Sequence, residues 1–180
     1  VFRVFHEARQ YGMTDINMDL IAGLTDETPA DFLFSVDTLI RLNPEKITLH
    51  ALARKAGSFL SDRDGKDSIY RPLPAWIDAF QTAQDRLRAA GYFPYYLYRQ
   101  KYAHAGLENI GFARPGHETV YNVAMMSDRV HVLGFGAGAS TKFIVNTRAN
   151  RLHNPKDVRL YLEQAGQLGQ SKVSAASKFL

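Results

Sequence analysis

Two predicted strands carry polar side chains where a strand buried on both sides would read as an apolar run. Asn17 and Asp19 alternate with apolar residues in the first strand, and Thr48 and His50 do so in the second. Such groups need polar partners or a ligand inside the fold. They lie near the carboxyl ends of strands predicted to be parallel, where ligands bind in such folds. The alternative is structural: Asp19 caps the following loop, and His50 is a core histidine whose hydrogen bonds are satisfied.

A glycine-rich segment, residues 134–141, follows another predicted strand. It has neither the G-x-x-x-x-G-K-[ST] spacing nor the G-x-G-x-x-G spacing, and no predicted helix follows it. A phosphate-binding loop is therefore not favoured. Glycines in this pattern better suit a backbone that approaches a large flat ligand, or tight packing within a bulged strand.

An aromatic run, residues 92–102, contains five tyrosines beside Arg99 and Lys101. Stacking and charge-assisted hydrogen bonds from such a run would suit an aromatic ligand that carries carboxylates. Single-stranded nucleic acid is a second possible ligand, and an edge strand with ordinary surface tyrosines is the structural alternative. If the run is a regular strand, Arg99 and Lys101 share one face, while Tyr98 and Gln100 share the other.

Composition excludes several kinds of site. The chain has no cysteine, so alone it offers no disulfide, no thiolate nucleophile and no cysteine ligand for zinc or an iron–sulfur cluster. Its six histidines lack metal-binding spacings, so no metal ligand is predicted. The net charge of +4 is spread along the chain, which does not favour nucleic acid as a partner. Without a secretory signal or a bilayer-length apolar segment, we expect a cytoplasmic location and no membrane contact.

Helices and strands alternate in the first third of the chain. Thr28, Pro29 and Asp31 predict a capped helix start, and Asn43 before Pro44 predicts its end. Helix and strand at this spacing imply parallel strands joined by right-handed crossovers, hence an α/β sheet or barrel wall. A long helix is then predicted between Pro74 and Gly91.

The pattern changes after Gly91, where strands are predicted at residues 119–126, 130–135 and 142–147 between several glycines. A last helix begins at Asn154. The sequence thus predicts three parts: helix–strand units at 1–91, a β-rich region at 92–165 and a flexible tail at 166–180.

Four segments together resemble the oxygen-independent coproporphyrinogen III oxidase family of radical S-adenosylmethionine (SAM) enzymes. They are residues 17–24, 42–50, 91–101 with 109–116, and 134–140. The chain is most similar to the coproporphyrinogen dehydrogenase-like branch, whose aromatic run ends in Tyr-Arg-Gln-Lys. The resemblance covers residues 1 to about 165.

The resemblance implies the second half of a partial (β/α)₆ radical SAM barrel, followed by a small β-rich C-terminal region with a terminal helix. SAM lies across the top of the barrel in that family. The family's SAM-contacting positions and its late glycine turn fall on five residues here: Asp19, Ala53, Gly136, Gly138 and Ser140.

The implied reaction is the oxidative decarboxylation of two propionates of coproporphyrinogen to vinyl groups in haem synthesis. Arg99, Tyr98 and Gln100 are the residues expected to bind this porphyrinogen substrate, Arg99 first because its planar guanidinium can bind both oxygens of a carboxylate. On a strand, Tyr98 and Gln100 form a competing set on the opposite face.

The family's cysteine-rich loop for a [4Fe–4S] cluster and its following Gly-Gly segment lie upstream of the matched region and are absent here. Without thiolates there is no cluster and no reductive cleavage of SAM. We therefore expect a fragment that is inert alone, holds neither SAM nor a cluster, and needs the N-terminal half of the same protein as its partner. Residues 16–21 should then form an exposed strand edge. A haem-binding relative without oxidase activity and a non-catalytic scaffold are the alternatives.

Overall fold

The computed structural model describes residues 1–53, 73–127, 129–146 and 148–178. They form two compact units, Val1–Thr119 and Val120–Leu180, and each unit is described by itself. The first unit holds a four-stranded sheet, and the second holds a two-stranded one. This boundary lies well after the one predicted at residue 91.

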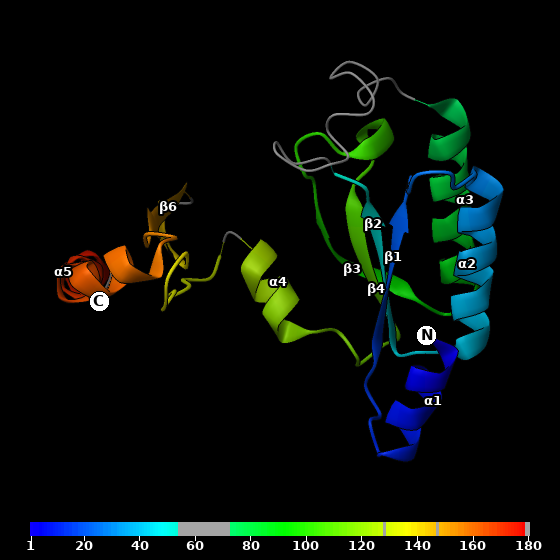
Figure 1. Cartoon of the computed structure of the whole chain (residues 1–180), viewed down its shortest axis with the longest axis horizontal. Coiled ribbons are helices and arrows are strands. Elements are labelled where there is room, and N and C mark those ends of the chain that lie inside the picture. The colour runs from blue at the N-terminus through cyan, green and yellow to red at the C-terminus, as the bar shows by residue number, and fades with distance from the viewer. Residues whose placement is uncertain (54–72, 128, 147, 179–180) are drawn as a thin grey trace. The chain divides into compact units, whose positions relative to one another are not determined.

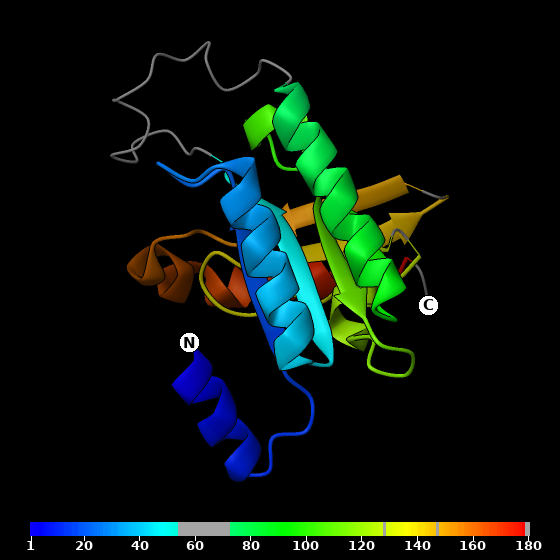
Figure 2. The same ribbon diagram turned by 90° about the vertical axis from the view of Figure 1, so that its right-hand side faces the viewer.

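The first unit is a mixed α/β layer. Its strands run in the order β1-β2-β4-β3, with β1 parallel to β2, and with β4 antiparallel to both β2 and β3. Figures 1 and 2 show α2 and α3 side by side on one face of this sheet. The elements are α1 (Phe2–Gln10), β1 (Asn17–Ala22), α2 (Pro29–Leu42), β2 (Lys46–Ala51), α3 (Pro74–Ala89), β3 (Phe93–Tyr98), the 3₁₀ turn η2 (His104–Gly106) and β4 (Asn109–Ala113).

Local sequence signals set the ends of α2 as predicted. The Thr28 hydroxyl accepts a hydrogen bond from the Asp31 backbone N–H, and the Asp31 carboxylate accepts one from the Thr28 backbone N–H. This reciprocal capping box satisfies two amide groups that the helix leaves unpaired. At the other end Asn43 takes the left-handed conformation, with φ of 57°, and ends the helix.

The core lies between the sheet and the two helices. The rings of Phe32 in α2 and Phe80 in α3 stack with centroids 6.1 Å apart. Ile47, Leu49 and Phe112 meet them from the strands and are fully buried. Burial of these side chains removes their apolar surface from water and positions β2 and β4 against the helices.

The predicted division at residue 91 is corrected by strand pairing. Residues 93–98 and 109–113 form β3 and β4, and β4 pairs directly with β2. The change in composition after Gly91 therefore marks a change from parallel to antiparallel pairing within one sheet. Because β4 lies between β2 and β3 and its backbone groups are hydrogen-bonded to theirs, it is part of this sheet and not of a separate region.

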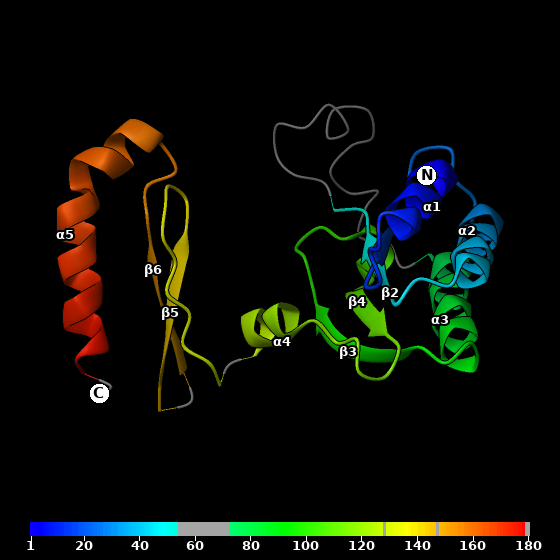
Figure 3. The same cartoon turned by 90° about the horizontal axis from the view of Figure 1, so that it is seen from below.

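The second unit contains α4 (Val120–Met126), β5 (Ser140–Val145), β6 (Arg148–His153) and α5 (Val158–Ala176). Figure 3 shows α5 running alongside the β5–β6 hairpin. The Asp157 side chain begins α5 by accepting a hydrogen bond from the Leu160 N–H at 2.9 Å. In the described part of the chain, no helix is both long enough and apolar enough to span a bilayer.

Three predicted features of this unit differ from the structure. Residues 119–126 were expected as a strand, but 120–126 are helical; the Lys142 ammonium bonds the carbonyls of Ala124 and Met125 at the end of that helix. Residues 130–135 contribute only a single bridge, between Val132 and Lys142. The expected flexible tail is helical to residue 176, since its alanine, glutamine and lysine residues favour helix once α5 has been started.

Candidate functional site

The sheet face opposite α2 and α3 is lined by polar and tyrosine side chains and is called the open face below. Among the described residues of the first unit, no α-helix packs against it (Figure 1). Asp19 pairs in register with Thr48, Thr48 with Gly111, and Gly111 with Tyr96, so one row of residues crosses all four strands. The predicted polar alternation of both parallel strands is confirmed: Met18 and Leu20 of β1 and Ile47 and Leu49 of β2 pack in the core. The open face comprises Asn17, Asp19, Thr48, His50, Asn109, Gly111, Tyr96 and Tyr98.

Asp19 and His50 form the charged centre of the open face. His50 Nε2 lies 3.7 Å from Asp19 Oδ1, and Asn17 Nδ2 donates to the same oxygen at 2.7 Å. The Asp19 side chain is 57% exposed, so its carboxylate can accept a hydrogen bond from a further donor. Hydrogen bonding to His50 lowers the pKa of Asp19 below its usual value despite partial burial. The same contact raises the pKa of His50, against the opposing effect of its burial.

Asn109 is a buried partner of His50 that sequence reasoning missed. Its Oδ1 accepts the Ala51 N–H at 3.1 Å and lies 3.1 Å from His50 Nδ1, while its Nδ2 donates to the Tyr98 carbonyl at 3.4 Å. It comes from β4, about sixty residues after His50. The available signal was an asparagine opening a strand whose next residues are apolar, because such a buried amide needs partners.

Tyr96 and Tyr98 form an aromatic wall beside the charged centre. Their rings are parallel within 6°, with centroids 6.5 Å apart. A Cβ at Gly111 would lie only 1.8 Å from Cε1 of Tyr96, so glycine lets that ring lie flat on the sheet. Burial raises the pKa of both tyrosines, which therefore act as neutral donors and acceptors at neutral pH.

The residues predicted for substrate binding do not all lie on this face. The Tyr98 hydroxyl lies 3.5 Å from His50 Nδ1 on the open face. Arg99 lies elsewhere: its guanidinium donates to the Gly106 carbonyl at 3.2 Å and lies 3.6 Å from the Glu108 carboxylate. Gln100 follows β3 and is half-buried.

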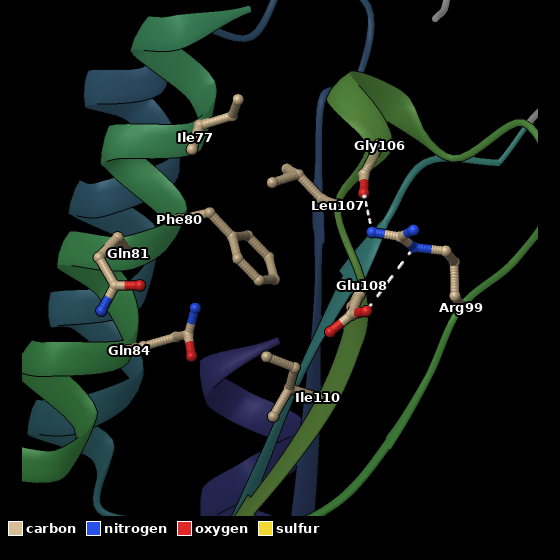
Figure 4. A pocket seen from close by; sticks show the side chains of 9 residues that line it. All are labelled: Ile77, Phe80, Gln81, Gln84, Arg99, Gly106, Leu107, Glu108 and Ile110. Carbon is tan, nitrogen blue, oxygen red and sulfur yellow. Dashed lines mark hydrogen bonds and ion pairs between the residues drawn. The ribbon is translucent and has the colours of Figure 1, made fainter. Parts of the chain in front are cut away.

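Arg99 lines a cavity of about 270 Å³ between α3 and β4. Figure 4 shows its guanidinium between Gly106 and Glu108, across the cavity from Phe80 and Gln84. The strand alternation within residues 92–102 therefore separates Tyr98 from Arg99, as the sequence predicted for a regular strand. The competing candidates were Arg99 on one side and Tyr98 with Gln100 on the other. Of these three residues, only Tyr98 lies beside Asp19 and His50.

The remaining predicted positions fall in two places. Ala53 follows the carboxyl end of β2 and bridges Ala103. Gly136, Gly138 and Ser140 belong to the second unit.

The glycine turn of the second unit is held by its own neighbours. The Gly136 N–H donates to the Tyr161 hydroxyl at 3.2 Å, and the Gly138 N–H donates to the Pro155 carbonyl at 2.7 Å. Gly136 and Gly138 have positive φ angles of 97° and 71°, which glycine adopts without strain, so both positions favour glycine. These amides therefore have partners within the unit and do not form an open anion cradle.

The chemistry of the open face suits an organic ligand with hydrogen-bond donors. It offers an ionised carboxylate, an imidazole, an amide and hydroxyl groups beside tyrosine rings. SAM carries amino and hydroxyl donors and a flat adenine, so these residues fit it. No group of three or more metal-ligating side chains occurs in the described ranges, and the chain holds no cysteine for a cluster.

Comparison with curated proteins finds relatives that match most of this chain. The chain is 36% identical over 174 residues to the oxygen-independent coproporphyrinogen-III oxidase-like protein HemZ of Bacillus subtilis, with 94% of the chain and 34% of HemZ covered. It is 26% identical over 184 residues to the oxygen-independent coproporphyrinogen III oxidase of Salmonella typhimurium, with 95% and 36% covered. Nearly all of this chain is similar to about a third of the length of these oxygen-independent coproporphyrinogen III oxidase-like proteins.

Other comparisons extend this result. The heme chaperone HemW of Bacillus subtilis is 26% identical over 140 residues, which cover 77% of the chain and 34% of HemW. The solved structure of coproporphyrinogen III oxidase (HemN) from Escherichia coli, described as a radical SAM enzyme, superposes with a TM-score of 0.59 at 23% identity. That superposition covers 92% of this chain and 37% of HemN and shows a shared fold. No family model matches the chain.

The chain spans about a third of the length of these curated relatives. The resemblance inferred from four sequence segments is thus confirmed at the level of the family.

Proposed function

We propose that the full-length protein is a radical SAM oxidoreductase that acts on coproporphyrinogen III, and that this chain forms one wall of its reaction chamber. The observation that carries the proposal is the open face of a parallel strand pair, with Asp19 beside His50 at 3.7 Å. In a partial (β/α)₆ barrel, helices cover the outer side of the sheet and the inner side faces the ligand. The positions of α2 and α3 agree with that arrangement.

The cofactor requirements divide between this chain and the rest of the protein. Asp19, Ala53 and the glycine turn with Gly136, Gly138 and Ser140 are proposed for the SAM side. The chain has no cysteine, so thiolates for a [4Fe–4S] cluster must come from outside it. SAM, once bound and reductively cleaved, supplies the radical chemistry of this enzyme class. Two propionates of the substrate would each lose CO₂, one hydrogen atom and one electron to become vinyl groups, the hydrogen atom passing to the SAM-derived radical and the electron to an external oxidant.

The N-terminal part of the same protein is the proposed partner of β1. In the described sheet β1 is an edge strand, paired only with β2. An unpaired edge exposes backbone N–H and C=O groups that another strand can bind. The 180-residue chain alone is therefore expected to self-associate in size-exclusion chromatography with light scattering. A stable monomer at high concentration would contradict the partner assignment.

The test of the main proposal is binding and turnover by the full-length protein under anaerobic, reducing conditions. SAM and coproporphyrinogen III should yield vinyl products. The Asp19→Ala variant should lose about 1–3 kcal/mol of SAM binding, the usual cost of a lost charge-assisted hydrogen bond. Asp37→Ala is the matched control, since Asp37 pairs with Arg86 on the outer helices. Equal SAM affinity in wild type and in a folded Asp19→Ala variant would remove Asp19 from the site.

Haem binding without oxidase activity is the second candidate, because the chain is also similar to the heme chaperone HemW. Titration of the full-length protein with haem, monitored by absorbance of the Soret band, distinguishes the oxidase from the haem-binding function. Vinyl products without tight haem binding support the oxidase. Haem binding without turnover supports the chaperone-like function, and the absence of both supports the scaffold interpretation.

A further inference from the structure

His50 is held between two different partners on the open face. Its Nδ1 lies 3.1 Å from Asn109 Oδ1 on β4, and its Nε2 lies 3.7 Å from Asp19 Oδ1 on β1. The His50 side chain is only 25% exposed, so its ring has little room to turn. Each ring nitrogen therefore faces one defined partner, Nδ1 facing Asn109 and Nε2 facing Asp19.

Asn109 determines which nitrogen of His50 carries a proton. Its amide cannot be reversed, because Oδ1 accepts the Ala51 N–H while Nδ2 donates to the Tyr98 carbonyl. Oδ1 is an acceptor, so the hydrogen of the 3.1 Å contact must come from His50 Nδ1.

Protonation of Nε2 then controls the contact with Asp19. In the neutral ring Nε2 has a lone pair, which would face the carboxylate and repel it. In the protonated ring Nε2–H points at Asp19. Among the described residues, the titratable groups facing the ring are Asp19 from β1 and Tyr98 from β3, while β4 contributes the non-titrating Asn109. The raised pKa of His50, caused first by its hydrogen bond to Asp19, agrees with this geometry.

We propose that His50 is a positioning residue for SAM: fixed by Asn109, its Nε2–H holds the Asp19 carboxylate in the orientation that receives the cofactor. This inference rests on the proposed function. Its consequence is a specific pH dependence. Affinity for SAM falls as pH rises through the pKa of His50, because Nε2–H is then lost. Asp19 itself stays ionised throughout that range.

The test compares SAM affinity of the full-length protein and of His50→Phe by calorimetry between about pH 6 and pH 9. Phenylalanine keeps an aromatic ring and leaves Asn109 Oδ1 bonded to the Ala51 N–H. The readout is the ratio of the two affinities, since titration of the SAM amino group affects both proteins alike. We expect His50→Phe to bind about tenfold more weakly at pH 6, as for loss of a charged hydrogen bond, and equally at pH 9.

His117→Phe is the matched control, because His117 faces Asp15 at 3.4 Å before the amino end of β1, away from the carboxyl end of the strands. It should bind SAM as the wild type does at every pH. A ratio for His50→Phe that does not change with pH, or a similar loss in His117→Phe, would overturn the positioning role.

A measurement without ligand keeps the two proposals distinguishable. NMR titration of histidine-labelled protein, with His50 assigned through His50→Phe, should show a His50 pKa that falls in Asp19→Asn, together with an Nδ1–H neutral tautomer. A His50 pKa that is the same in both proteins refutes the positioning pair. Wild-type protein that binds no SAM at any pH refutes the proposed function instead.

Discussion

Gly111 permits the close approach of the Tyr96 ring to the centre of the open face, so Gly111→Ala is the sharpest steric perturbation of the site. The added Cβ would lie 1.8 Å from Cε1 and 2.4 Å from Cδ1 of Tyr96. Carbon atoms at van der Waals contact are about 3.5–4.0 Å apart, so the ring must move by roughly 1.5 Å or more. Tyr95 at a centroid distance of 4.8 Å and the stacked Tyr98 restrict that movement.

The expected cost is about 1–3 kcal/mol of unfolding free energy, the usual penalty for forcing extra volume into a packed site. The Tyr96 hydroxyl should also leave Thr48 Oγ1, which lies 3.5 Å away. Equilibrium urea unfolding of the full-length protein, followed by circular dichroism, measures the first effect. Displacement of the ring should also weaken ligand binding at the open face, which calorimetry with SAM or the porphyrinogen measures.

Two controls separate this steric cause from a general effect of alanine. Gly169→Ala adds the same methyl group to α5, where no neighbouring atom lies within 4 Å, and should stabilise by about 0.5–1 kcal/mol. In a Tyr96→Ala background, Gly111→Ala should cost much less, because the clashing ring is absent. Equal costs in the two backgrounds, or no cost in either, would refute the reasoning.

Two further predictions concern the open face, and a third concerns the start of α2. The stability advantage of wild type over Asp19→Asn, measured by urea unfolding, should be largest between pH 3.8 and 6.5, the ordinary pKa values of the two partners. It should be lost as pH rises through the raised pKa of His50 and as pH falls through the lowered pKa of Asp19; a flat profile would contradict the ion pair. Tyr98→Phe should raise the KM for coproporphyrinogen more than Arg99→Ala does, because only Tyr98 lies on the open face; steady-state kinetics showing the reverse order would reassign the substrate side to the opposite face. Thr28→Ala should destabilise the protein by about 1 kcal/mol through loss of the capping box; Thr38→Ala, at a half-buried position in the same helix whose hydroxyl accepts a hydrogen bond from Arg41, is the control for a change of threonine alone.

The sequence by itself determined the features that depend on neighbouring residues. Alternation along a strand has a period of two, so the polar side of Asn17, Asp19, Thr48 and His50 could be predicted without knowing any partner strand. The ends of α2 were likewise predicted, because the capping box of Thr28 involves residues three positions apart.

Only the tertiary structure decided how distant segments combine into the site. Pairing of β4 with β2 brings Asn109 to His50, about sixty residues away in the sequence, and pairing of β4 with β3 brings Gly111 beneath Tyr96, about fifteen residues away. Nothing local in the sequence specifies such pairings, since they depend on which strand edges remain unpaired and on how the helices cover one face. The same reason explains why residues 120–126 form a helix where β-rich composition predicted a strand: local propensity is weak, and distant contacts such as those of Lys142 settle the result.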